Sequence, residues 1–175
     1  MRPARVFRMI LRIFVLVLTI SMSLISFLGG LSAVKILSNP DNIKLPNGNI
    51  QANFDIQHPN SIYIKVPFKI TNEGYFDLED LYIKITIAAV DGHGDEVEIF
   101  QKSTNFGDIP KGESLSDVYS GDYKDFIISN IYEAYLQLDY SSGITLKADI
   151  VLGAKYELGL LSLRVELYNI PVGSL

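Results

Sequence analysis

An uncharged stretch of 22 residues, Ile13 to Val34, constrains the fold of this chain more than any other feature. As an α-helix it would extend about 33 Å, which matches the roughly 30 Å hydrocarbon core of a bilayer. We therefore interpret residues 13–34 as a transmembrane signal-anchor. Two alternatives are a signal sequence cleaved near Gly30-Leu31-Ser32 and a helix buried in the core of a soluble domain.

The charges on the two sides of this stretch differ in sign. Residues 1–12 carry four arginines and no acid, whereas the rest of the chain carries eleven Lys or Arg against twenty Asp or Glu. Positive flanks stay on the cytoplasmic side of a membrane. We expect a cytoplasmic basic flank at 1–12, with the C-terminal domain outside the cytoplasm. The acidic body also argues against nucleic-acid binding, which needs a basic surface.

The segment after the anchor has the composition of a linker. Residues 35–49, "KILSNPDNIKLPNGN", hold two prolines, four asparagines and a glycine, without a sustained period. Such a segment is typical of an extended connection. The remaining residues, 50–175, are enough for one domain.

Alternation of apolar and polar residues dominates that domain and predicts β-strands. Turn signals such as "DGHG" at 91–94 separate the strands. Strands are expected at 50–56, 62–70, 81–89, 97–102, 115–120, 135–140, 144–156 and 158–170, with a short helix from Asp122 to Asn130. Short strands with frequent turns predict an all-β, two-layer antiparallel sandwich of 7–8 strands preceded by one helix.

A proline and several tyrosines in these strands allow two further predictions. Pro67 cannot donate a backbone hydrogen bond, so its strand is expected at a sheet edge or at a bulge. Four tyrosines fall on the polar phase of their segments or near turns, where they could form a contact surface: Tyr63, Tyr82, Tyr119 and Tyr123. The competing interpretation is that tyrosine simply favours strands.

The residue inventory excludes several chemistries. There is no cysteine, so disulfides, zinc-thiolate sites and thiol nucleophiles are impossible. The two histidines are His58, beside a proline, and His93, in "DGHGDE". Asp91, Asp95 and Glu96 offer oxygens to a hard cation there, but the loop lacks the bidentate Glu of a calcium site.

A solvated hairpin tip is therefore the favoured interpretation of residues 91–96. A second acidic group, which we interpret as a solvated corner, consists of Glu73, Asp77, Glu79 and Asp80. We predict no catalytic, cofactor-binding or metal-binding residues, no nucleotide, and no enzymatic activity.

Several short motifs resemble one family. They are His58-Pro59-Asn60, "IYIKVPFKITN", the corner "TNEGYFDLEDL" at 71–81, and Ile109-Pro110-Lys111-Gly112 within "FGDIPKGES". Over residues 50–120 the chain resembles the LEA14-like or WHy (water stress and hypersensitive response) family. The closing "AKYELGLLSLRVELYNIP" is similar to the tail of archaeal membrane-anchored proteins with the same sandwich. The resemblance implies an immunoglobulin- or fibronectin-III-like sandwich without enzymatic activity, although His58 departs from the family's Asn.

Together these features predict a single-pass membrane protein with a non-catalytic extracytoplasmic sandwich for protein interaction, adhesion or cell-envelope assembly. A partner strand could add to an exposed edge, either at the Pro67 strand or at 158–170. The alternative, which follows from the resemblance, is a stress-protective protein that shields membranes or proteins during water loss.

Overall fold

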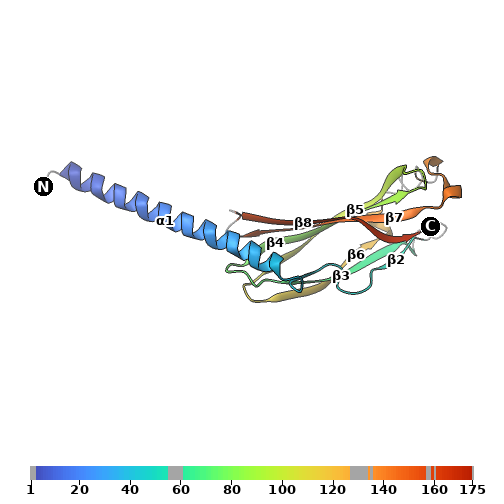
Figure 1. The fold of residues 1–175 in the computed structure, drawn as a ribbon, viewed down its shortest axis with the longest axis horizontal. Helices are drawn as coiled ribbons and strands as arrows, with labels where there is room; N and C mark the ends of the chain where they lie inside the picture. Colours follow the sequence, from blue (N-terminus) through green and yellow to red (C-terminus); the bar gives the residue numbers. More distant parts are fainter. Residues whose placement is uncertain are drawn as a thin grey trace.

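The computed structural model describes residues 3–54, 61–126, 134, 136–156, 159 and 161–174. One long helix, α1 (Pro3–Ser38), projects from an elongated β-domain (Figure 1). The strands are β1 (Ile43–Lys44), β2 (Gln51–Asn53), β3 (Tyr63–Thr71), β4 (Leu78–Val90), β5 (Glu96–Ile109), β6 (Ser114–Asp122), β7 (Thr145–Tyr156) and β8 (Leu161–Ser174). Two short 3-10 turns, η2 (Tyr123–Asp125) and η3 (Tyr140–Ser142), lie between β6 and β7.

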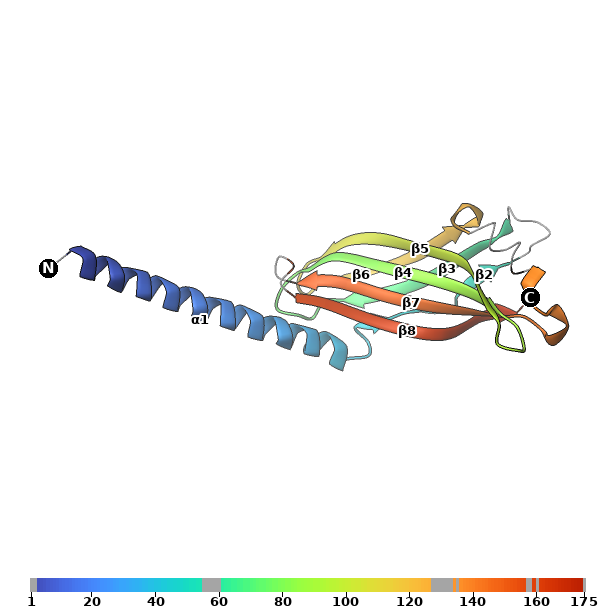
Figure 2. The ribbon, with the colours of Figure 1, turned by 90° about the horizontal axis from the view of Figure 1, so that it is seen from above.

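The strands form two antiparallel sheets. One has the order β5-β4-β7-β8. In the other, β3 pairs with β6 along its whole length and with the short β1 and β2. Figure 2 shows the strands running along the length of the domain, with α1 leaving from one end. The predicted antiparallel sandwich preceded by a helix is confirmed.

The core lies between the sheets and follows the predicted alternation. In β3 and β4 the apolar phase is buried and the other phase is more exposed. The buried residues of the predicted apolar phase are Ile62, just before β3, and Ile64, Val66, Phe68, Ile70, Leu81, Ile83, Ile85, Ile87 and Ala89. At the end of β4, Ala88 and Val90 of the other phase are buried as well. Period-2 patterning therefore fixed the inward faces of both strands correctly.

Pro67 does not mark an edge strand, because β3 lies inside its sheet. On the side of β3 opposite β6, no described strand pairs with Pro67, because β1 pairs with residues 69–70 and β2 with residues 63–65. The Pro67 carbonyl accepts a hydrogen bond of 2.6 Å from the Asn47 N–H, in the loop between these strands. In a strand, the N–H and C=O of one residue point to the same side, so the side on which Pro67 lacks an N–H faces this gap. No hydrogen bond between strands is lost there.

Tyr119 is not on an exposed face. It is fully buried, and its hydroxyl donates to the Lys102 carbonyl at 2.9 Å. Burial, with a smaller contribution from the Asp125 carboxylate, raises the pKa of the Tyr119 phenol. The alternating position two residues later is Gly121, whose missing side chain leaves room for the Phe100 ring. The predicted phase of this strand was wrong because one of its inward positions is a glycine.

Gly121→Ala is expected to destabilise the sandwich by about 2 kcal/mol through overpacking. A Cβ at this position would lie 2.6 Å from the Phe100 ring, and a packed ring cannot shift freely. Chemical unfolding of Gly121→Ala, Phe100→Leu and the double variant would measure the coupling. We expect the double variant to be less destabilised than the sum of the single variants; strict additivity would contradict the steric explanation.

The segment between β6 and β7 contains helical turns and lacks the strand that was predicted there. Asp122 caps η2, and the Asp122 and Asp125 side chains form a reciprocal capping box. The remainder of the expected helix, 127–130, lies outside the described residues. The strand predicted at 135–140 is wrong: Leu136 and Gln137 are helical, and the Leu138 N–H donates to the Ala134 carbonyl. Ala134 and Leu138 are both buried, so helical spacing replaced alternation here.

Residues 35–49 are more ordered than a free linker. The helix begins at Pro3, within the expected flank, and continues to Ser38, past the expected end of the anchor at Val34. Residues 43–44 then form β1. Ile36 and Asn42 are buried, because the end of α1 packs against the sandwich. The helix and the sandwich are therefore joined by a short, packed connection.

Candidate anchor and interaction surfaces

The first two thirds of α1 expose an apolar surface. Every residue from Val6 to Phe27 is exposed. The helix is long and apolar enough to cross a membrane, and its apolar window is 0% buried. The alternative of a helix inside a soluble core is therefore contradicted. An apolar surface of this size is unstable in water and requires a cover.

Burial along α1 begins where the helix meets the sandwich. Gly29, Ser32 and Ile36 are buried and lie on one helical face, because they are three and four residues apart. The Ser32 hydroxyl donates to the Leu28 carbonyl at 3.0 Å and accepts the Tyr75 N–H at 2.8 Å. The helix thus contacts the loop between β3 and β4 directly.

Asn42 holds the chain immediately after the helix. Its side-chain nitrogen donates to the Ile36 carbonyl at 3.4 Å and to the Glu73 carboxylate at 3.2 Å. Its own carbonyl accepts the Thr71 N–H at 2.8 Å. One buried asparagine therefore ties the last turn of α1 to the end of β3. This satisfies a helix C-terminal carbonyl that would otherwise lack a partner.

The corner at 72–77, between β3 and β4, is organised by Asn72. The fully buried Asn72 side chain donates to the carbonyls of Phe76 and Ile109, both at 2.9 Å, and accepts the Gly74 N–H at 3.0 Å. Its backbone bonds with Gly112 and Glu113. These bonds join the corner to the turn at 109–112, so two segments that are far apart in the sequence lie side by side.

Neither Asn72 nor Gly74 adopts the left-handed backbone that both residue types tolerate. Gly74 is instead required by space. A Cβ there would lie 2.9 Å from the Asn72 side-chain oxygen and 3.1 Å from the Ser32 Cβ. The glycine lets the corner approach α1 closely.

The acidic residues around this corner have separate partners. The Asp77 carboxylate accepts the Lys111 N–H at 2.7 Å, and Asp80 pairs with Lys155 at 2.8 Å. The Asp80 contact raises the pKa of the Lys155 ammonium, first through the hydrogen bond and then through the charge. Glu73 accepts from Asn42. Among the described residues, no three His, Cys, Asp or Glu side chains gather to hold a metal ion.

The loop at 91–95 lies at the end of the sandwich farthest from α1 (Figure 2). The Asp91 carboxylate accepts the N–H groups of His93 at 2.9 Å, Asp95 at 3.0 Å and Asp139 at 3.1 Å. The His93 ring contacts the Asp139 carboxylate at 3.3 Å. Asp91 therefore organises this tip from within, as the interpretation of a hairpin tip requires. His58 lies outside the described residues.

Asp91→Asn is expected to reduce stability at neutral pH but much less in acid. Backbone hydrogen bonds, first that from Asp139, hold the pKa of the Asp91 carboxyl below its ordinary value. A lowered folded-state pKa stabilises the fold above the unfolded-state pKa, about 3.9, and this contribution is lost as the pH falls through the folded-state pKa. Urea unfolding at neutral pH and near pH 3 would test this, since an unchanged difference between wild type and variant would contradict it.

The tyrosines divide between core and surface. Tyr63 is exposed, Tyr123 is half-buried and Tyr119 is buried. The half-buried Tyr82 ring covers Gly153, where a Cβ would lie 2.4 Å from the ring. The four tyrosines therefore do not form a single contact surface. The roles of Ser32, Ile36 and Asn42 at the junction were not predicted; the signal for them in the sequence is the spacing of Gly29, Ser32 and Ile36.

No family model matches the chain, and the search of curated proteins gives no match. A solved structure with some similarity is that of Spo0M, a sporulation control protein from Bacillus subtilis. The identity is 11%, the TM-score is 0.32, and the match covers 74% of this chain and 49% of that chain. The chain thus spans about half the length of that protein, and a similarity at this level assigns neither fold nor function. The resemblance to the LEA14-like family stays a prediction.

Proposed function

We propose that this chain is a single-pass membrane-anchored protein that holds a non-catalytic β-sandwich outside the cytoplasm for protein interaction or cell-envelope assembly. The observation that carries this proposal is α1, an apolar helix exposed from Val6 to Phe27 that ends packed against the sandwich. A lipid bilayer is the environment that covers such a helix on all sides.

The charge distribution supports the orientation. Four arginines precede the apolar segment, and the sandwich that follows it is acidic. Arginine-rich flanks are retained on the cytoplasmic side, so the sandwich crosses the membrane.

The absence of cysteine allows a direct test of this topology. His93→Cys places a thiol at the distal loop, and Phe7→Cys places one near the start of α1, where the side chain is exposed. A membrane-impermeant maleimide on intact cells should label His93→Cys, whereas Phe7→Cys should react only after permeabilisation. Labelling of neither variant on intact cells would overturn the orientation. An intact mass lacking the first 30 residues would indicate a cleaved signal sequence.

The sheet β5-β4-β7-β8 has edges at β5 and β8, and β8, which contains most of the segment 158–170, is the edge that we propose for a partner strand. β8 pairs with β7 and has no second strand partner among the described residues. Its usable part is Leu161–Tyr168, because Asn169 has a φ of 56° and Pro171 has no N–H. Strand addition here predicts slower amide hydrogen exchange along this segment when the partner binds. Protection confined to the loop at 91–95 would contradict this mode of binding.

A deletion strain separates interaction from stress protection. Impaired adhesion or envelope assembly with normal survival of drying would support the interaction function. Normal adhesion and envelope with poor survival of drying would favour the protective function that the LEA14-like resemblance implies.

A further inference from the structure

The geometry of α1 sets the height of the sandwich above a membrane. If the hydrocarbon layer begins after Arg12, the twenty residues to Ser32 cover about 30 Å, which is the thickness of that layer. Residues up to Phe27 are exposed, and burial against the sandwich begins just before Ser32. The outer surface of the hydrocarbon layer and the first contact with the sandwich therefore fall at the same level of the helix.

Tyr75 is held at this level. Its N–H donates to the Ser32 hydroxyl at 2.8 Å. The flanking residues are fixed as well: Asn42 binds the Glu73 carboxylate, and Asn72 binds Gly74 and Phe76. The corner at 72–77 is thus packed against the helix and cannot rise away from the membrane without breaking these bonds.

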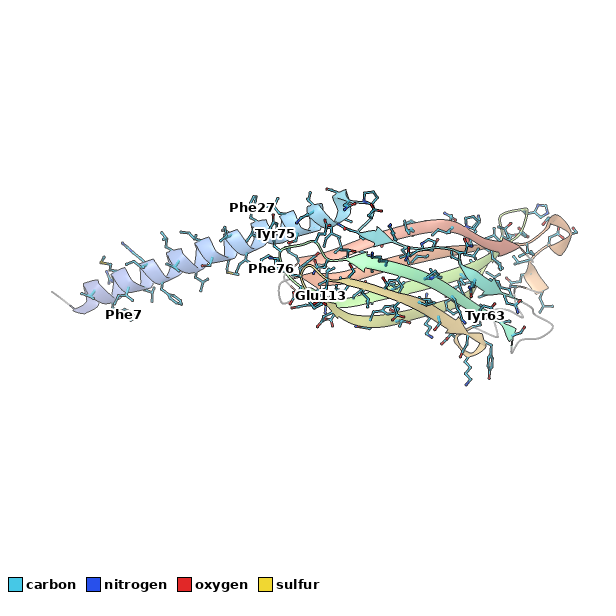
Figure 3. The ribbon with its side chains drawn as sticks, turned by 90° about the horizontal axis from the view of Figure 1, so that it is seen from below. Phe7, Phe27, Tyr63, Tyr75, Phe76 and Glu113 are labelled. Atoms are coloured by element: carbon cyan, nitrogen blue, oxygen red, sulfur yellow. The ribbon has the colours of Figure 1, made fainter. Side chains whose placement is uncertain are left out.

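The Tyr75 side chain has the surroundings of an interfacial aromatic residue. It is 42% exposed, and two lysine ammonium groups lie over its ring, Lys35 at 5.6 Å and Lys111 at 5.8 Å from the centroid. Figure 3 shows Tyr75 and Phe76 beside α1, near Phe27, and Tyr63 at the opposite end of the sandwich. Tyrosine places its apolar ring toward lipid chains and its hydroxyl toward water, and lysine extends its ammonium to the headgroups.

Acidic residues at this end of the sandwich offset the charge of the lysines, so this end does not prefer anionic lipids. Glu73 accepts a hydrogen bond from the Asn42 side chain, Asp77 accepts one from the Lys111 backbone N–H, and Glu113 lies at the same end (Figure 3). Carboxylates therefore lie at the same end as the two lysines and offset their positive charge. The suitable surface is a zwitterionic headgroup layer, in which lysine contacts phosphate.

We propose that this end of the sandwich rests in the lipid headgroup layer, with Tyr75 at the boundary of the hydrocarbon and with Lys35 and Lys111 contacting lipid phosphates. The inference rests on the proposed membrane anchor and adds a fixed height and orientation. The sandwich stands on the bilayer by one end and presents the loop at 91–95 at the other.

The chain has no tryptophan, so single substitutions give unambiguous fluorescence probes. The full chain is reconstituted in phosphatidylcholine vesicles with bromine either near the headgroup end or near the chain end of the lipid. Tyr75→Trp should give blue-shifted emission, quenched about twofold more by the shallow bromine than by the deep one. Tyr63→Trp, at a site 38% exposed, is the matched control and should be quenched by aqueous iodide but by neither lipid.

Phe27→Trp separates failure of this inference from failure of the anchor. Quenching of Phe27→Trp by brominated lipid without quenching of Tyr75→Trp would overturn the docked orientation and leave the anchor intact. Absence of quenching in both would overturn the anchor itself. Circular dichroism matching that of wild type establishes that each variant is folded.

The lysine contacts are tested in the Tyr75→Trp background. Lys35→Gln with Lys111→Gln should reduce quenching by the shallow bromine about twofold, because two phosphate contacts are lost. Lys65→Gln is the control, since Lys65 lies over the distal Tyr63 ring at 5.6 Å. Equal quenching in both backgrounds would overturn the role of the lysines.

Discussion

Asn72→Ala is expected to lower the free energy of unfolding by about 3 kcal/mol, because a buried carbonyl that loses its hydrogen bond costs about 1–3 kcal/mol. The substitution leaves the Phe76 and Ile109 carbonyls without the donor they share, and the Gly74 N–H without its acceptor. No polar atom of alanine replaces them. Urea unfolding of the full chain in detergent micelles, followed by circular dichroism, measures the loss.

Asn105→Ala is the matched control for this prediction. Asn105 also accepts an N–H two residues ahead, that of Gly107 at 2.7 Å, but it is exposed and water can replace it. We expect a loss below about 1 kcal/mol there. Equal losses for the two alanine variants would show that burial of Asn72 is not the cause.

Asn72→Asp adds a second readout. A carboxylate keeps the acceptor for the Gly74 N–H but cannot donate to the carbonyls of Phe76 and Ile109. Because these carbonyls and burial disfavour the charged form, the folded-state pKa of the new carboxyl is raised. The variant should therefore become more stable relative to wild type as the pH falls below that value. If the difference in the free energy of unfolding between this variant and wild type stayed constant from neutral pH to about pH 4, the proposed hydrogen bonds of Asn72 would be contradicted.

Alternation allowed much of the fold to be predicted, because a strand with one buried face shows its inward phase in sequence. Ile62–Ile70 and Leu81–Ala89 are examples. The phase was wrong at Tyr119, where Gly121 removes the apolar signal and the tyrosine hydroxyl finds a buried acceptor. Pro67 misled the prediction for a different reason: the gap between β1 and β2 depends on pairing partners distant in sequence.

The junction could not be predicted from local pattern. Residues 35–49 have the composition of a linker, and nothing in their order indicates that Asn42 binds Ile36 and Glu73. The residues at 71–81 predicted a corner but did not show what holds it in place. Asn72 acts through side-chain hydrogen bonds and Gly74 through close approach to α1. Both depend on where the helix lies, which is a tertiary property.

Ile36→Ala, in the last turn of the helix proposed as the anchor, is expected to destabilise the sandwich by about 3 kcal/mol, the usual cost of truncating a buried isoleucine. Ile36 is 0% exposed and belongs to the same core cluster as residues of both sheets. Its loss leaves a cavity where α1 closes the core near β1 and β8. The measurement is again urea unfolding of the full chain in micelles.

Leu37→Ala is the control, because it removes a similar apolar side chain from the same helical turn at a position 53% exposed. We expect a change within about 0.5 kcal/mol for it. If the last turn of α1 were only a flexible connection, the two variants would be equally stable. The fixed height inferred for the sandwich would then have no structural basis. A large loss for Ile36→Ala alone means that the helix cannot swing away from the sandwich without opening its core, so the orientation of the sandwich on a membrane is set by the stability of the fold itself.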